Sequence, residues 1–232
     1  MISKLHFILN TLFLTYASYL DIKTREITDK IWLIMLIVNI PFTIYFILNI
    51  SNTLRTIYIV NSIISITLFL LLAYFGFMGG ADAKALIILQ LSEINSILPS
   101  SLLIYINGIL LSLLVVPYIL YRNLQYYLRH RYLFRKKIPL YKKILMIISS
   151  YKMKYSEKMG KNKYFYTFLG KDEKTIRLKM RIDENDFKID SKISEGEEIW
   201  ISPTIPLILF ITVGYIVYKI WGNIIFKLFL LS

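Results

Sequence analysis

The chain has 232 residues, 56% of them hydrophobic, whereas ordinary soluble domains carry roughly 45–50% apolar residues, so it is predicted to be an integral membrane protein. Cysteine is absent and the two histidines, His6 and His130, are isolated, which excludes disulfides, thiol nucleophiles and a Cys- or His-based metal site; no cofactor is expected. The formal net charge is +13, but 20 of the 28 Lys and Arg residues lie between Arg122 and Lys192, so the charge belongs to one hydrophilic segment.

Three apolar runs begin the chain, at residues 5–20, 31–50 and 57–77. The second and third carry no charge and have close to the ~20 residues that cross a ~30 Å hydrocarbon core. Residues 15–18, Thr-Tyr-Ala-Ser, resemble a signal-peptidase site and leave open the removal of the first run as a signal peptide. A retained helix is favoured, because removal would take one span from a polytopic protein.

The later runs are less uniform. The fourth, residues 83–98, contains several polar side chains, so it could span only with its polar face against other helices. The fifth, residues 102–121, carries no charge and is long enough to span. The sixth, residues 205–231, carries two lysines that could snorkel to the membrane surface.

A hydrophilic insertion of 80 residues, 122–201, separates the fifth and sixth runs. Its first part, residues 126–143, is rich in Arg, Lys and Tyr, which suits a helix lying on anionic lipid headgroups. Farther on, residues 163–169 and 175–182 predict a β-hairpin, because the second segment alternates apolar and charged residues. The insertion is therefore expected to be a small α+β cap.

These elements predict an all-α polytopic membrane protein with six transmembrane helices and a small cytoplasmic α+β insertion before the last helix. The expected domains are a membrane domain at 1–121, a basic cytoplasmic insertion at 122–201 and the sixth transmembrane helix at 202–232.

Cytoplasmic loops carry excess Lys and Arg. The loop after the first run has three such residues between Lys23 and Lys30, whereas the next loop has Arg55 alone, so the first loop is expected to be cytoplasmic.

Two aspartates lie at the ends of these runs. Asp21 closes the first run, and Asp82 opens the fourth after a glycine-containing stretch. Two spans separate them, so both emerge on the same, cytoplasmic face.

Two converging carboxylates can share one proton, since like charges at ~3 Å cannot both ionise easily. One can then act as base toward water while the other polarises a scissile carbonyl. Asp82 begins a helix and Asp21 ends one, so the helix dipoles favour Asp82 as the base.

The residues around both aspartates resemble a known family. Gly79, Gly80, Ala81 and Asp82, with Lys84 two residues on, resemble the GxGD motif of the type IV prepilin peptidases in its Gly-x-hydrophobic-Asp form. Residues 21–27 are similar to the first-aspartate loop of that family, and the layout resembles its archaeal preflagellin peptidase branch.

This resemblance implies a multi-pass aspartic endopeptidase of the cytoplasmic membrane, with its active site facing the cytoplasm. It implies that short, positively charged leader peptides are removed from preflagellins or pilin-like precursors, with Asp21 and Asp82 as the catalytic pair. The sequence departs from the family pattern at Thr28, where the family often has proline, and at Ala81, where it has the second glycine.

Further residues are candidates for the approach of the substrate. Gly79 and Gly80 permit close approach of another chain. Glu26 and Asp29 share the loop of Asp21 and could attract the lysines of a leader, although they are equally well explained as solvated loop charges.

Other interpretations stay open for these residues. Asp82 alone suits a helix N-cap, and Gly76 with Gly80 suits a helix-packing motif. Asp21, Asp82, Lys84 and Glu93 could belong to a small transporter, but no inverted repeat is apparent and both aspartates fall at run ends rather than at the midplane. An anchor that binds nucleic acid is disfavoured because the insertion lacks an RRM-like or helix-turn-helix signature. Glu93 is expected to face a polar neighbour inside the bundle, and both histidines are expected to be incidental.

Overall fold

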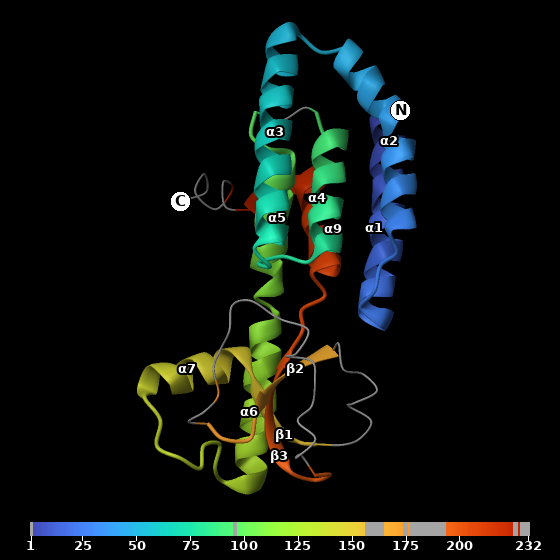
Figure 1. Ribbon diagram of the computed structural model, residues 1–232. Helices are drawn as coiled ribbons and strands as arrows, with labels where there is room; N and C mark the ends of the chain where they lie inside the picture. The colour runs from blue at the N-terminus through green and yellow to red at the C-terminus, as the bar shows by residue number, and fades with distance from the viewer. Residues whose placement is uncertain are drawn as a thin grey trace. The chain divides into compact units, whose positions relative to one another are not determined.

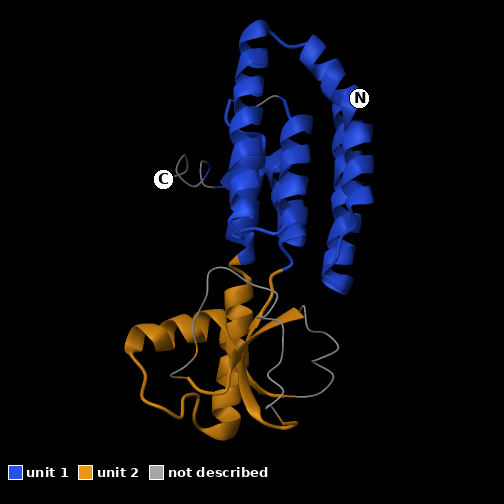
Figure 2. Ribbon diagram, in the orientation of Figure 1, with its two compact units in different colours: residues 1–112, 206–232 blue, residues 113–205 orange. Residues whose placement is uncertain are grey.

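The structure is a computed structural model that describes residues 2–94, 97–155, 165–173, 176, 194–224 and 227. The chain forms two compact units, shown in Figure 2. One unit contains Met1–Ser112 and Pro206–Ser232, and the other contains Leu113–Ile205.

The first unit is a helical bundle (Figure 1). Its helices are α1 (Ile2–Thr24), α2 (Asp29–Leu48), α3 (Asn52–Tyr74), α4 (Gly80–Ser92), α5 (Ser100–Ser112) and α9 (Leu207–Trp221). Helix α9, from the C-terminal end of the sequence, packs against α1 and α5. Helix α1 contributes Leu14 and Ala17 to the core, and Ser18 shares a hydrogen bond with Thr212 of α9 (2.7 Å between the hydroxyl oxygens), so α1 is integral to this bundle.

Within the part of the chain that the structure describes, three helical segments are long and apolar enough to cross a membrane, namely Asp29–Leu48, Asn52–Tyr74 and Ser100–His130. Many large apolar side chains on α2 and α3 are exposed, including Leu33, Ile37 and Ile63. Apolar residues on the outside of a bundle are typical of helices that face lipid. The prediction of a mainly helical membrane protein with a small sheet is therefore confirmed, while the number of six spans stays a prediction.

Helix α4 occupies the centre of the bundle and packs against α2, α3, α5 and α9. Ala85, Leu86 and Leu89 of this helix are fully buried. The side-chain oxygen of Gln90 accepts hydrogen bonds from Ser65 Oγ and from the backbone N–H and hydroxyl of Ser101, at 3.1–3.2 Å. Gln90, Ser92 and Glu93 of the fourth run thus face other helices. Contacts of this kind allow a polar segment to be accommodated inside a membrane bundle.

The apolar run at 102–121 is divided in the structure. Helix α5 ends at Ser112, α6 (Val115–His130) begins three residues later, and the boundary between the two units falls at the same place. Pro117 explains the interruption, because proline has no N–H for the carbonyl of Leu113 and its ring clashes with that carbonyl.

The second unit contains α6, α7 (Leu140–Ser149) and a three-stranded sheet. The strands are β1 (Tyr151–Lys154), β2 (Tyr166–Gly170) and β3 (Glu198–Pro203), in the order β1–β3–β2, with both outer strands antiparallel to β3. Successive side chains of a strand point to opposite faces. Ile199 and Ile201 accordingly pack with Ile119 of α6, and Trp200 packs with Met146 of α7.

The first strand of the predicted hairpin is present, and the hairpin itself stays a prediction. The strand predicted at 163–169 corresponds to β2, but the strand that pairs with β2 is β3, far along the chain. Of the segment 175–182, all but Ile176 lies outside the described residues.

Candidate active site

Asp21 lies in the last turn of α1, and its carboxylate is held from two sides. It accepts a hydrogen bond from the backbone N–H of Ile208, the second residue of α9. It also faces the guanidinium of Arg25, with Nη1 3.6 Å from Oδ1. The first N–H groups of a helix have no partner within the helix and carry the positive end of its dipole. The start of α9 therefore provides a favourable position for a carboxylate.

Asp82 is the third residue of α4, and its carboxylate accepts a hydrogen bond from the backbone N–H of Gly79, the N-cap residue. This is the carboxylate half of a capping box. A Cβ atom on Gly79 would stand 2.7 Å from Asp82 Oδ2, whereas one on Gly80 would meet nothing within 4 Å. The structure thus gives a steric reason for glycine at 79 and none at 80.

The two aspartates and Arg25 act on one another electrostatically, and all three lie outside the candidate spans. Burial, and then the Asp21 carboxylate, raise the pKa of Asp82 to about 7, against opposing effects of the Gly79 N–H and Arg25. Burial also raises the pKa of Asp21, but Arg25 and the Ile208 N–H oppose that rise. The arrangement therefore favours an ionised Asp21 beside a protonated Asp82.

This distribution is opposite to the one expected from the helix dipoles. The expectation placed Asp21 at the negative end of its own helix, α1, and so favoured its protonated form. In the structure the Asp21 carboxylate lies at the positive end of another helix, α9. The sequence identifies only the helix that carries each aspartate. The effect of α9 on the pKa of Asp21 could therefore not be predicted from the sequence.

Arg25 is the site residue that the sequence did not single out. Its backbone adopts the left-handed conformation (φ 59°) and its N–H bonds to the carbonyl of Asp21 (3.2 Å), which ends α1. Its side chain is only 13% exposed and points back to the aspartate four residues earlier. The i, i+4 spacing of Asp21 and Arg25 was the available signal in the sequence. Arg25 was instead counted with the neighbouring basic residues, as a charge that sets the orientation of the chain in the membrane.

The remaining candidates differ in their surroundings. Lys84 pairs with Asp29, with Nζ 2.6 Å from Oδ1, and so links the starts of α4 and α2. Both side chains are exposed. Glu26 is exposed, and its carboxylate forms no ion pair with the described basic residues. Ala81, at the second glycine position of the motif, packs at the edge of the core.

Metal ligands do not gather near the aspartates. Within the described ranges, no three His, Asp or Glu side chains lie close enough together to hold a metal ion. What the site presents is two carboxyl groups of different pKa, one cation and two backbone N–H groups.

Comparison with known proteins gives consistent matches over this region. Residues 8–120, which include both aspartates, match the model described as the type IV leader peptidase family. The chain is 29% identical to a preflagellin peptidase of Methanococcus maripaludis, covering 94% of this chain and 96% of the relative. It is 29% identical to a preflagellin peptidase of Methanocaldococcus jannaschii, covering 97% of each. A preflagellin peptidase of Methanococcus voltae is 25% identical, covering 94% of this chain and 95% of the relative.

Proposed function

We propose that this chain is a membrane aspartic endopeptidase of the type IV leader peptidase family, and that it removes leader peptides from preflagellins. The observation that carries the aspartic mechanism is the position of Asp21 and Asp82. They come from different helices and act on each other, in surroundings that favour opposite protonation states.

The proposed chemistry assigns a separate role to each carboxyl group. Ionised Asp21 accepts a proton from a water molecule as that water attacks the scissile carbonyl carbon. Protonated Asp82 donates a hydrogen bond to the carbonyl oxygen, where negative charge develops. Asp21 then returns its proton to the leaving amine as the C–N bond breaks. Arg25 stabilises the ionised form of Asp21 before the reaction begins.

We further propose that leader lysines approach along the loop of Asp21. Glu26 is the better candidate to attract them, because Asp29 is already paired with Lys84. The proposed location is the cytoplasmic membrane, crossed six times, with the aspartates facing the cytoplasm. The basic residues after α1, against Arg55 alone in the next loop, support that orientation.

The proposed lipid partner rests on helix α7. Five of its large apolar side chains are exposed, namely Leu140, Tyr141, Ile144, Leu145 and Ile148. Lys142 and Lys143 lie beside them in the sequence. Apolar residues next to lysines on one short helix suit the interface of an anionic bilayer. No role in nucleic-acid binding is proposed.

The function is tested by incubating the purified protein, in detergent, with a full-length preflagellin. We expect a shortened product that begins at a single new N-terminus. The double variant Asp21→Asn/Asp82→Asn, purified in the same way, serves as the control for contaminating proteases. Equal shortening by both proteins would contradict the proposal.

A further inference from the structure

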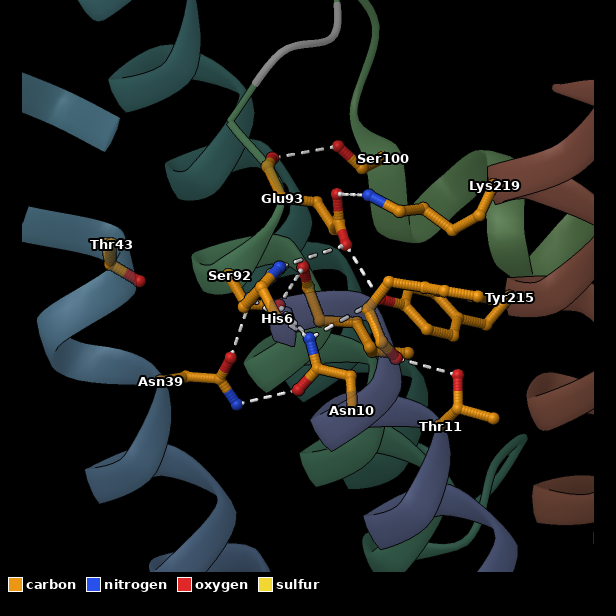
Figure 3. Close-up of polar contacts among 12 residues, drawn as sticks. His6, Asn10, Thr11, Asn39, Thr43, Ser92, Glu93, Ser100, Tyr215 and Lys219 are labelled. Atoms are coloured by element: carbon orange, nitrogen blue, oxygen red, sulfur yellow. Dashed lines mark hydrogen bonds and ion pairs between the residues drawn. The ribbon is translucent and has the colours of Figure 1, made fainter. Parts of the chain in front are cut away.

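The first unit contains a second group of polar residues, at the end of the bundle away from the aspartates (Figure 3). At its centre is Glu93, which directly follows α4 and is 8% exposed. Tyr215 OH donates to Glu93 Oε1 at 2.9 Å, and Lys219 Nζ donates to Glu93 Oε2 at 2.8 Å. Both carboxylate oxygens are therefore bound by α9.

The same group includes side chains of α1 and α2. His6 Nδ1 lies 3.9 Å from Glu93 Oε1, and His6 Nε2 donates to Asn39 Oδ1 at 2.8 Å. Asn39 Nδ2 donates to Asn10 Oδ1 at 2.8 Å. We call these six residues the Glu93 cluster: His6, Asn10, Asn39, Glu93, Tyr215 and Lys219. His6 is thus part of a buried network, and the expectation that it is incidental was wrong.

The Glu93 cluster specifies geometry more than it adds stability. Burying an ion pair costs desolvation free energy that the pairing only partly recovers. In a bilayer, apolar contacts between helices compete with equally apolar lipid, so they define the axial position of a helix weakly. Hydrogen bonds have directional requirements, and a set of them that joins four helices allows few rotations and displacements.

Three of these helices also build the candidate active site. Asp82 begins α4 and Glu93 follows its end, a separation of roughly 16 Å at 1.5 Å per residue. Ile208, whose N–H holds Asp21, begins α9, and Lys219 lies roughly 16 Å farther along the same helix. Asp21 and His6 are roughly 22 Å apart on α1. A shift of α9 along its axis at the Glu93 cluster would therefore move the Ile208 N–H by the same amount.

We propose that Glu93 is a positioning residue for the reaction, because the Glu93 cluster holds α4 and α9 in the register that places Asp82 and the Ile208 N–H beside Asp21. This inference rests on the proposed peptidase function only for its kinetic consequences. The predicted register itself is a property of the bundle and can be measured without a substrate.

We expect the cluster to tolerate substitution, because it borders a cavity of about 460 Å³ whose walls include Ser3, Phe46 and Tyr218. Water entering this cavity can solvate a charge left by the loss of its partner.

Glu93→Gln and Lys219→Met, which remove the ion pair from opposite sides, are therefore suitable variants. Lys219→Arg keeps the charge. Arg55→Met is the matched control, since Arg55 lies at the same end of the bundle and the one described hydrogen bond of its side chain goes to the carbonyl of Ile47.

The first measurement is a distance between spin labels on cysteines placed at Ile22 and Phe77, both exposed, in a chain that has no cysteine of its own. We expect a narrow distribution of label-to-label distances in the protein that carries only the two labelled cysteines, and also in Arg55→Met. In Glu93→Gln and Lys219→Met we expect broadening and a shift of about 1–2 Å, the size of a typical helix shift. Unchanged distributions in both variants would overturn the inference.

The second measurement is the cleavage of preflagellin. We expect kcat to fall roughly 10- to 100-fold in Glu93→Gln and Lys219→Met, because misplacement by 1 Å is that costly to catalysis. KM should change less than twofold, and Lys219→Arg should restore most of kcat. The acid limb of the kcat profile should move to higher pH, because Asp21 loses the Ile208 N–H that lowers its pKa. A uniform loss of folded enzyme would lower kcat without moving this limb.

The outcomes separate the two proposals. Normal kcat in Glu93→Gln, with inactive Asp21→Asn and Asp82→Asn, would overturn the positioning role and leave the peptidase function intact. Cleavage by the aspartate variants would overturn the function, and the label distances would still decide whether the Glu93 cluster sets the register.

Discussion

The carboxylate of Asp21, near the end of the first helix, accepts a hydrogen bond from the backbone N–H of Ile208, at the start of the last described helix. This contact joins the two ends of the sequence at the candidate active site. It also places Asp21 at the positive end of α9, which, together with Arg25, favours its ionised form. Asp82 is left as the carboxyl group that holds its proton more strongly.

The first prediction concerns the two carboxyl groups. Asp21→Asn and Asp82→Asn should each cleave preflagellin at no more than a trace of the wild-type rate, because an amide cannot accept or donate the required proton. The double variant should be scarcely slower than either single variant, since the two groups act as one unit. At position 82 the amide N–H can still donate a hydrogen bond, but a weaker one than a carboxylic acid donates to a developing negative charge. All three proteins should elute with the wild type in size exclusion. Near-normal cleavage by a well-folded single variant would contradict the aspartic mechanism.

The second prediction is a bell-shaped dependence of kcat/KM on pH. Activity should fall as the pH rises through about 7, because Asp82, whose pKa is raised to about 7, then loses the proton that it donates to the carbonyl oxygen. It should also fall in acid, as Asp21 becomes protonated. The two apparent values belong to the pair as a whole. A profile that stays flat well above pH 7 would exclude Asp82 as the protonated partner.

A third prediction isolates Arg25. Arg25→Met removes the cation that lowers the pKa of Asp21, so the acid limb of the profile should move to higher pH. Lys23→Met is the control, because Lys23 is exposed in the same turn and contacts the Tyr19 ring rather than either aspartate. If both variants shift the limb equally, the effect comes from the general charge of the loop.

The fourth prediction compares two neighbouring glycines. Gly79→Ala should fold, because the obstructing atom is the end of the flexible Asp82 side chain, but it should displace that carboxylate and lower kcat at least about tenfold. Gly80→Ala should be close to wild type, since its Cβ would meet nothing within 4 Å. Thermal unfolding of both variants, followed by tryptophan fluorescence, checks that they fold alike. Equal kinetics for the two would remove the steric explanation.

The fifth prediction tests how leaders are recognised. Glu26→Gln should reduce the preference for lysine-rich over lysine-poor leaders by no more than about fivefold, as befits an exposed pair, and the effect should shrink in high salt. Asp29→Asn should change that preference less, because Lys84 already pairs with Asp29. Competition between the two leaders in one reaction measures the ratio directly. An unchanged ratio in Glu26→Gln would rule out this recognition role.

The sequence by itself determined the membrane class, the positions of the long apolar helices and the two aspartates. These features are local: a hydrophobic run of sufficient length is read without knowing its neighbours, and an acid at the end of such a run is conspicuous because it is costly to bury. The expectation that Glu93 faces a polar neighbour was confirmed for the same reason, since its contacts are Tyr215 and Lys219.

Only the tertiary structure decided which residues surround those acids. The pairing of β2 with β3, the contact of Ile208 with Asp21 and the link from Glu93 to His6 all join segments far apart in the chain. No local pattern encodes such contacts, because they depend on how the helices pack. The pKa shifts of the aspartates follow from these contacts, so the proposed assignment of base and acid required the structure.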